Sequence, residues 1–271
     1  IIFSDENNHA SMIEGIRKGN SDKFIWKHND VDHLEYLLKN SNKDHPKIVA
    51  FESVYSMDGD FAPIKKIIEV SKKYNALTYL DEVHGVGLYG KNGGGLSEQL
   101  GLTSEIDIIE GTLAKGFGLM GGYITAKSNI IDVIRSFAPG FIFTTSLPPS
   151  LAAAAVASIR FVKNNHSLRE ALYERADKLK KLMLAHNLPI IKNNSHIVPL
   201  LVKDPVRCKE ISDILLNDYS IYVQPINYPT VPKGLERLRF TPTPLHDDSK
   251  LEFLVNALDQ IWRELKLSRA A

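Results

Sequence analysis

A glycine-rich stretch near the middle of the chain holds a lysine and a threonine that could do chemistry. Residues 107–118 indicate a short buried strand that leads into a turn containing Lys115, with Thr112 three residues earlier. A desolvated lysine with a lowered pKa is a good amine nucleophile and forms Schiff bases with carbonyl groups. The flanking glycines would let the backbone approach a ligand closely, and the threonine hydroxyl could donate to a phosphate. A solvated lysine in an ordinary surface turn is the alternative, because glycine-rich loops are weakly specific.

Two carboxylates and a histidine follow a second apolar run. Residues 76–80 are rich in β-forming side chains and lead directly into Asp81, Glu82 and His84. In open α/β sheets, ligands bind at the carboxyl ends of the strands. An aspartate and a lysine on separate strand ends suit pyridoxal phosphate, because the carboxylate keeps the pyridine nitrogen protonated while the lysine carries the aldehyde. A helix N-cap role for Asp81 and a loop role for His84 are the alternatives.

Several long motifs resemble, in this order along the chain, those of the α-oxoamine synthases. They are residues 7–15 (NNHASMIEG), 52–60 (ESVYSMDGD), 81–84 (DEVH), 111–115 (GTLAK) and 141–149 (FIFTTSLPP). These enzymes are fold-type I pyridoxal-phosphate proteins that condense an amino acid with an acyl-CoA. Residues 28–34 (HNDVDHL), 139–149 (PGFIFTTSLPP) and 224–232 (QPINYPTVP) are most similar to the members that use glycine and succinyl-CoA. The resemblance covers essentially the whole chain.

The resemblance implies a role for each of five residues around the cofactor ring. Lys115 would carry pyridoxal phosphate and act as the general base that removes a proton from glycine Cα. Asp81 would pair with the pyridinium nitrogen, and His9 would stack on the ring, with a histidine that caps the following helix as its alternative. His84 and Ser56 would lie near the phenolic oxygen of the ring.

Phosphate and substrate contacts are also implied. Thr112 would contact the cofactor phosphate, as would Thr144 and Thr145 across a dimer interface. Arg239 would hold the carboxylate of the amino acid, a task that suits its planar guanidinium. The remaining expected contacts, to acyl-CoA and substrate, are Ser4, Lys23 and Thr230. Arg237, two residues before Arg239, is expected to be a structural surface charge.

The implied reaction joins glycine to succinyl-CoA with loss of CoA and CO₂, in a homodimer with shared active sites. Other members of the family, with a different substrate pair, are the alternative within the class, because they share the lysine, the aspartate and the histidines. A structural fragment without activity is the alternative from outside the class.

Composition and charge limit the partners and the compartment that the sequence predicts. The chain of 271 residues has 33 basic and 32 acidic side chains, so its charge predicts neither nucleic acid nor an anionic membrane as a partner. No apolar run approaches the roughly 20 residues of a transmembrane helix. The single cysteine, Cys208, excludes an internal disulfide framework and suits a reducing compartment, and its helical spacing with Ile211 and Leu215 predicts a core position. The histidines show no metal-ligand spacing.

The chain opens with the apolar run Ile1, Ile2 and Phe3, without an initiator methionine or a leader. Family members carry a long segment before this point, so we expect an internal-to-C-terminal fragment. The family implies the bacterial cytoplasm or the mitochondrial matrix. We predict a large cofactor-binding domain over residues 1–164, incomplete at its N-terminus, and a smaller domain over residues 165–271.

The order of elements predicts the fold class. Apolar strands at residues 1–3, 24–26, 47–52 and 76–80 alternate with helical patterns at 12–18, 31–38 and 63–74, which is typical of a mostly parallel α/β sheet with helices on both faces. Strands at 108–109 and 123–126 and a helix through 152–162 complete it. The smaller domain is expected to be α+β, with strands at 197–202 and 221–224. Its last helix should begin with a capping box of Ser249 and Glu252.

Overall fold

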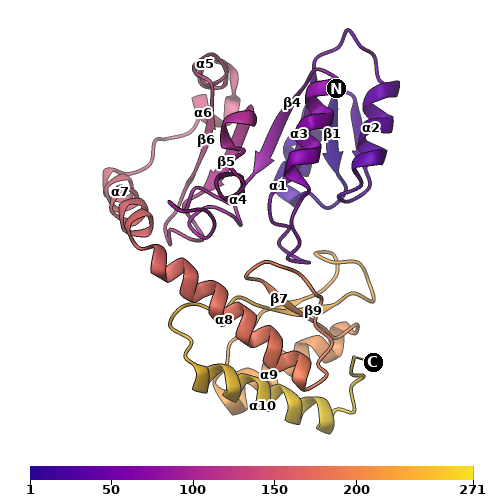
Figure 1. Cartoon of the computed structure of the whole chain (residues 1–271), viewed down its shortest axis with the longest axis vertical. Coiled ribbons are helices and arrows are strands. Elements are labelled where there is room, and N and C mark those ends of the chain that lie inside the picture. The colour runs from indigo at the N-terminus through magenta and orange to yellow at the C-terminus, as the bar shows by residue number, and fades with distance from the viewer. Residues whose placement is uncertain (271) are drawn as a thin grey trace. The chain divides into compact units, whose positions relative to one another are not determined.

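The computed structural model describes residues 1–270, which form two compact units (Figure 1). The first unit consists of Ile1–Tyr55 and Phe61–His166, and the second contains Ser56–Asp60 and the chain from Ser167 onward. The sequence did not predict that Ser56–Asp60 belongs with the second unit. Ala271, the last residue of the predicted smaller domain, lies outside the described residues.

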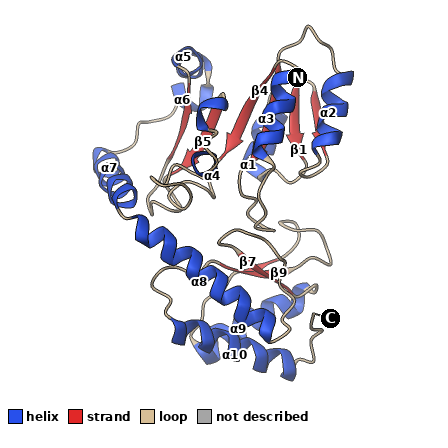
Figure 2. Ribbon diagram, viewed as in Figure 1, coloured by secondary structure: helices blue, strands red, loops and turns tan. Residues whose placement is uncertain are grey.

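A six-stranded sheet forms the centre of the first unit, with strand order β2-β1-β3-β4-β5-β6. The first five strands pair in parallel, and β6 runs antiparallel to β5. Their bounds are β1 (Ile2–Asp5), β2 (Lys23–Trp26), β3 (Lys47–Glu52), β4 (Ala76–Asp81), β5 (Ile108–Thr112) and β6 (Gly122–Ala126). The predicted mostly parallel α/β sheet is therefore confirmed, and Figure 2 shows these strands in red between the helices.

Helices flank this sheet. They are α1 (Ala10–Lys18), α2 (Val31–Asn40), α3 (Ile64–Lys73), α4 (Leu96–Gln99), the 3₁₀ turn η1 (Thr103–Glu105), α5 (Ser128–Phe137), α6 (Pro139–Ile142) and α7 (Pro149–Asn164). Helix α3 begins after Pro63 and buries Ile64, Ile67 and Ile68 at helical spacing, so one face packs inward. Strand β3 is buried along nearly all of its length, because helices leave neither face of a parallel sheet exposed.

The second unit is an α+β structure with its own core. Strands β7 (Val198–Leu201), β9 (Arg237–Phe240) and β8 (Pro225–Ile226) form an antiparallel sheet in that order. Its helices are α8 (His166–Ala185), α9 (Pro205–Tyr219) and α10 (Asp248–Glu264). The predicted core position of Cys208 is confirmed, because the side chain is fully buried in the same cluster as Leu258 and Trp262.

Two local predictions in this unit are wrong. Residues 221–224 do not form a strand, because the carbonyl of Val223 accepts a hydrogen bond from the Ser212 hydroxyl of α9 (2.6 Å), and pairing begins only at Pro225. The capping box is also wrong, since Asp247 caps α10 by accepting from the Lys250 N–H (3.0 Å). The Ser249 hydroxyl donates to the Asp247 carboxylate instead (2.7 Å).

Within residues 1–270, no helix combines the length and the apolar character that a membrane crossing requires. The same residues contain no group of three or more histidine, cysteine, aspartate or glutamate side chains that could hold a metal ion.

Candidate cofactor site

A pocket of about 220 Å³ lies at the carboxyl ends of β3, β4 and β5 in the first unit. Its lining consists of His9, Ser11, Glu52, Asp81, Val83, His84, Glu110, Gly111, Thr112, Lys115 and Gly122. The structure therefore brings together five side chains that the sequence singled out: His9, Asp81, His84, Thr112 and Lys115. They come from three separate segments, the start of α1 and the ends of β4 and β5, so the topology of the sheet is what gathers them.

Asp81 ends β4 and is almost completely buried, with 5% of its surface exposed. The backbone N–H of Val83 donates to its Oδ1 atom (2.6 Å). Burial and the nearby Glu110 carboxylate together raise the pKa of Asp81 to about 7, whereas the Val83 N–H and Lys115 oppose the shift. A buried carboxylate of this kind gains stability from a cationic hydrogen-bond donor.

Lys115 lies in the turn between β5 and β6, and its exposed side chain lines the pocket. The turn is closed by hydrogen bonds from Gly118 N–H to the Lys115 carbonyl (3.0 Å) and from Leu119 N–H to the Leu113 carbonyl (2.7 Å). Leu113 and Phe117 anchor it by packing into a small buried cluster. The sequence suggested a desolvated lysine. In the structure, buried residues anchor the turn, but the Lys115 side chain itself is exposed to solvent.

His9 combines the two roles that the sequence left open. It is the N-cap of α1, where its Nδ1 atom accepts from the Ser11 N–H (3.3 Å) and lies 2.8 Å from the Ser11 hydroxyl. The imidazole also lines the pocket, and the His9 backbone N–H lowers the pKa of the nearby Glu52 carboxyl, against the effect of burial. Capping therefore fixes the position of this histidine at the pocket.

Thr112 and Gly111 shape the wall that β5 contributes. The Thr112 hydroxyl donates to the Gly121 carbonyl (3.2 Å) and accepts from the Ala114 N–H (3.0 Å). A side chain at Gly111 would collide with the ring of Tyr123 on β6. This position therefore needs glycine, because the tyrosine lies directly against its backbone.

Sequence reasoning missed three residues of the pocket: Glu52, Glu110 and Ser11. The two glutamates end or interrupt apolar strand segments, the same signal that identified Asp81, and register pairs both of them with Asp81. Three carboxyl groups therefore stand side by side on β3, β4 and β5. Ser11 belongs to the motif that contains His9, and its hydroxyl completes the helix cap.

Seven predicted site residues do not line this pocket. They are Ser4, Lys23, Ser56, Thr144, Thr145, Thr230 and Arg239. In the first unit, the buried Ser4 hydroxyl accepts from Asn8 Nδ2 (2.9 Å), and the exposed Lys23 Nζ donates to the Arg17 carbonyl (3.2 Å). The Thr144 hydroxyl donates to the carbonyl of Gly140 (2.6 Å), and Thr145 is exposed.

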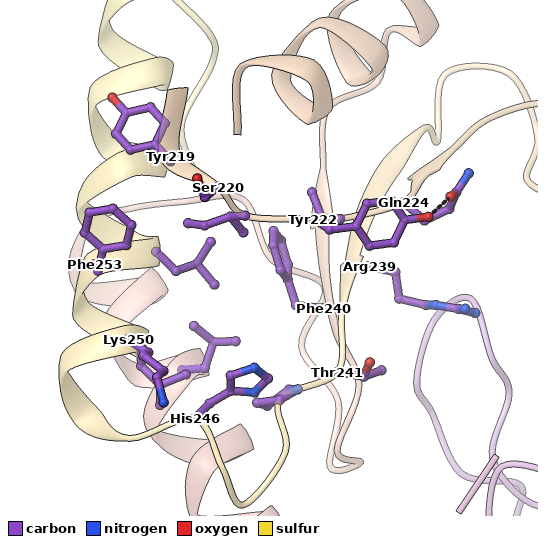
Figure 3. A pocket seen from close by; sticks show the side chains of 16 residues that line it. Tyr219, Ser220, Tyr222, Gln224, Arg239, Phe240, Thr241, His246, Lys250 and Phe253 are labelled. Atoms are coloured by element: carbon purple, nitrogen blue, oxygen red, sulfur yellow. Dashed lines mark hydrogen bonds between the residues drawn. The ribbon is translucent and has the colours of Figure 1, made fainter. Parts of the chain in front are cut away.

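Arg239 and Ser56 lie together in the second unit. The half-buried guanidinium of Arg239 donates to the Ser56 carbonyl (3.1 Å), and burial lowers its pKa. Arg239 also borders a mainly apolar pocket of about 540 Å³, in which the Tyr222 hydroxyl donates to Gln224 Oε1 (2.8 Å; Figure 3). Thr230 occupies an exposed turn after β8.

Arg237 corrects an expectation. It is not a surface charge: only 2% of the residue is exposed. Its guanidinium forms an ion pair with Asp58 (2.6 Å) and donates to the Met57 (2.9 Å) and Leu235 (2.9 Å) carbonyls. Arg237 therefore ties the segment Ser56–Asp60 to β9, and sequence reasoning missed it because an arginine on a short strand usually faces water.

The donor set of the first pocket fits pyridoxal phosphate. It contains a lysine amine, a buried carboxylate whose pKa is raised by burial, a flat imidazole at the rim and a threonine hydroxyl. The cofactor requires groups of these types, because it has an aldehyde, a protonated ring nitrogen, a flat ring and a phosphate. Asp81 in particular would gain a cationic partner.

The chain belongs to the aminotransferase class I and II family, which it matches over residues 1–258. Among curated relatives, it is 56% identical over 272 residues to 5-aminolevulinate synthase of Paracoccus denitrificans, covering 100% of this chain and 66% of the relative. It is also 56% identical over 270 residues to 5-aminolevulinate synthase of Rhizobium meliloti, covering 100% of this chain and 67% of the relative. The chain thus spans slightly less than two thirds of the first of these proteins.

A solved structure of SPT with PLP has the same fold. It superposes with a TM-score of 0.94 at 32% identity, over 98% of this chain and 67% of that chain. The predicted fold, that of a fold-type I pyridoxal-phosphate transferase, is confirmed, as is the resemblance found in the motifs.

Proposed function

We propose that the full-length protein is a pyridoxal-phosphate-dependent acyltransferase that condenses glycine with succinyl-CoA. One molecule of each gives 5-aminolevulinate, CoA and CO₂. The observation that carries the proposal is the pocket in which Lys115, Asp81 and His9 meet, in a chain 56% identical to proteins named 5-aminolevulinate synthase. The resemblance implies that 5-aminolevulinate is made here for tetrapyrrole synthesis, as the first intermediate of that pathway.

The cofactor would be held by groups at several edges of the pocket. Lys115 Nζ would bind the aldehyde carbon, and the Asp81 carboxylate would accept from the ring nitrogen. His9 would lie on the ring face, and His84 and Ser56 would lie near the phenolic oxygen. The Thr112 hydroxyl would donate to the phosphate, together with Thr144 and Thr145 of a second copy of the chain.

When bound, pyridoxal phosphate supplies an electron sink for a carbanion next to the amino group. Lys115 Nζ would take the proton from glycine Cα and later return a proton to the product. The Asp81 carboxylate would stay negative and would hold the proton on the ring nitrogen. His9 excludes water from one face and orients the substrate there.

Substrate recognition would involve residues outside the pocket lining. Arg239 would hold the glycine carboxylate through paired N–H donors. Thr230 would help to recognise the succinyl carboxylate, and Ser4 and Lys23 would contact the acyl-CoA. Specificity would follow because donors built for a carboxylate remain unpaired with an analogue that lacks one.

The functional unit would be a homodimer that shares its active sites, with no nucleic acid or membrane as a partner. The two curated relatives described above are bacterial, which favours the bacterial cytoplasm over the mitochondrial matrix. A 2-amino-3-ketobutyrate CoA ligase or an 8-amino-7-oxononanoate synthase is the alternative within the class, because the same lysine, aspartate and histidines serve all three reactions.

Product analysis of the purified full-length protein tests the proposal. The protein, loaded with pyridoxal phosphate, is offered glycine, alanine or serine with succinyl-CoA, acetyl-CoA or a long-chain acyl-CoA, and the products are identified by mass spectrometry. We expect 5-aminolevulinate from glycine and succinyl-CoA at the highest kcat/KM. Faster turnover of another pair would replace this function with one of the alternatives.

A matched arm tests the alternative of an inactive fragment. Residues 1–271 alone and the full-length protein are treated with pyridoxal phosphate and borohydride, and the labelled lysine is mapped. Label at Lys115 in the full-length protein is expected. Label at another lysine would contradict the site.

A further inference from the structure

Glu52 is a buried acid that lines the pocket and has no part in the proposed chemistry. It ends β3, is 3% exposed and is the register partner of Asp81 on β4. Side chains of register partners in a parallel pair leave the sheet on the same face, so the two carboxyl groups are neighbours. Glu52 therefore stands where a second negative charge would compete with the one that Asp81 must carry.

Two neighbouring acids each accept a hydrogen bond from another side chain. Asp5, at the end of β1, accepts from His28 Nδ1 (2.8 Å) and from the backbone N–H groups of Asn29 (3.0 Å) and Asn7 (2.9 Å). Glu110 accepts from the hydroxyl of Tyr79 (2.6 Å).

Glu52 faces mostly groups that oppose its ionisation. Only the His9 backbone N–H and the Lys115 cation lower its pKa and so favour its charged form. The titratable and charged groups around it are Asp81 and His84 from β4 and its loop, Asp5 from β1, His9 from the start of α1, Tyr55 after β3, and Glu110 and Lys115 from β5 and its turn.

Burial and charge repulsion indicate which of the neighbouring carboxyl groups, Glu52 on β3 or Asp81 on β4, keeps a proton. Two adjacent buried carboxyl groups cannot both ionise cheaply, so one keeps its proton. Burial, together with Asp81 and Asp5, raises the pKa of Glu52 to about 9, whereas that of Asp81, which accepts from the Val83 N–H (2.6 Å), is raised to about 7. The proton that the pair shares near neutrality therefore belongs to Glu52.

We propose that Glu52 is a positioning residue that the fold holds as a neutral carboxylic acid. In this state it leaves Asp81 as the negative charge of the pair, and it lines the same pocket as Asp81 and His9. The proposal rests on the proposed function in one respect, that Asp81 is the partner of the cofactor's ring nitrogen. The protonation of Glu52 itself does not depend on that function.

The stability of the full-length protein between about pH 7 and 8.5 is the decisive measurement. In this range the folded state keeps a proton on Glu52 that the unfolded chain has lost, so the unfolding equilibrium constant should rise about tenfold per pH unit from this group. Glu52→Gln keeps the size and the neutral charge of the side chain, and should remove this rise. Glu110→Gln changes the neighbouring carboxyl group on β5. It is the control and should retain the rise of the unfolding equilibrium constant with pH.

An equal pH dependence in the wild-type protein and Glu52→Gln would overturn the proposal. If Glu52→Gln does not fold, infrared spectroscopy of the wild-type protein decides instead. A protonated carboxylic acid band should be present at pH 7 and should disappear with a midpoint near pH 9. Absence of that band at pH 7 would equally overturn it.

Cofactor binding separates this proposal from the proposed function. Glu52→Gln should bind pyridoxal phosphate within about threefold of the wild-type affinity at pH 7, and Glu52→Lys should lose most of it. A loss of tenfold or more in Glu52→Gln would show that the glutamate acts as an anion. Failure of the wild-type protein to bind the cofactor would remove the proposed function and leave the pH dependence of stability as the test of Glu52.

Discussion

At the scale of single residues, the charge state of Asp81 decides what the candidate pocket can do. The side chain is buried, and its pKa is raised to about 7, mainly by burial and by Glu110. A cation on the ring nitrogen of the cofactor would reverse this shift, because an opposite charge at hydrogen-bond distance favours the ionised form. Binding of the cofactor and ionisation of Asp81 should therefore be coupled.

Replacement of Asp81 by asparagine should greatly reduce turnover. The amide keeps the size of the side chain but cannot hold the ring nitrogen protonated, so the electron sink weakens. We expect kcat to fall by roughly 100-fold or more, the scale seen when one preorganised electrostatic group is lost. Steady-state kinetics and the visible spectrum of the loaded full-length protein measure the effect.

Glu110→Gln is the control for this change, since Glu110 is the register partner of Asp81 on β5 and is held by the Tyr79 hydroxyl. Its turnover should fall by less than about tenfold, because the lost carboxylate is not the proposed partner of the ring nitrogen. Near wild-type turnover in Asp81→Asn would refute the role of the aspartate.

Sequence reasoning identified those residues of the pocket that belong to short, recognisable motifs. Asp81, His84 and Lys115 were recognisable because polar groups follow apolar strands, and all three line the pocket. Glu52 carries the same signal and was not singled out as a site residue. Its neighbour in the sheet is 29 residues away along the chain, so only the strand register reveals the pair.

At the scale of elements, the loop after β4 and the turn after β5 pack backbone against backbone. A Cβ atom at Gly116 would lie 2.7 Å from the Val86 carbonyl oxygen and 3.2 Å from Gly87 Cα. Gly87 itself has a φ of +81°, a conformation that glycine adopts readily. This contact holds Lys115 next to the loop that carries His84, so two glycines set the spacing of these two candidate site residues.

Gly116→Ala should disturb the pocket more than it disturbs the fold. The added methyl group meets backbone atoms that cannot rotate away, so the lysine turn must shift. We expect the affinity for pyridoxal phosphate to fall by roughly tenfold or more, with about 1–3 kcal/mol lost from the free energy of unfolding. Equilibrium dialysis and urea unfolding of the full-length protein measure the two effects.

Gly118→Asn tests the same turn without that contact. Gly118 has a φ of +68° and no atom within 4 Å of its would-be Cβ, and asparagine tolerates this backbone conformation. Its cofactor affinity should stay close to that of the wild-type protein. Equal losses in the two variants would mean that general loosening of the turn, rather than the contact with Val86, controls the lysine.

The elements themselves were predictable where one physical signal dominates. Strand β3 is an apolar run that is buried almost throughout, β4 is an apolar run that is buried at most of its positions, and α3 has a clear apolar stripe, so hydrophobic periodicity identified them. Strand β9 was missed because Arg237 and Arg239 interrupt its apolar pattern, and the buried ion pair of Arg237 with Asp58 forms only in the folded chain. A contact between residues 179 positions apart leaves no local trace in the sequence.

At the scale of the whole molecule, the first unit exposes large apolar side chains on consecutive elements. Helices α5, α6 and α7 and the segment that joins them carry most of these side chains, and 86% of Phe143 is exposed. The exposed members are Val133, Phe137, Phe141, Ile142, Phe143, Leu147, Val156, Ile159 and Phe161. Apolar surface concentrated in this way is typical of an interaction site, which supports the proposed dimer, and Thr144 and Thr145 lie within the same stretch of chain.

Mixing two inactive variants tests whether the active sites are shared. One variant is Lys115→Ala, and the other replaces both Thr144 and Thr145 by valine. If these threonines serve the site of the partner subunit, a mixed dimer has one site with both defects and one site with none. Random exchange of subunits makes half of the dimers mixed, so about a quarter of the sites should regain wild-type activity.

Lys115→Ala mixed with Asp81→Asn is the control. Both defects then lie on residues of the same subunit's pocket, so each site in a mixed dimer keeps one of them and no activity returns. No recovery in the threonine mixture, with subunit exchange verified by mass spectrometry, would show that each chain completes its own site.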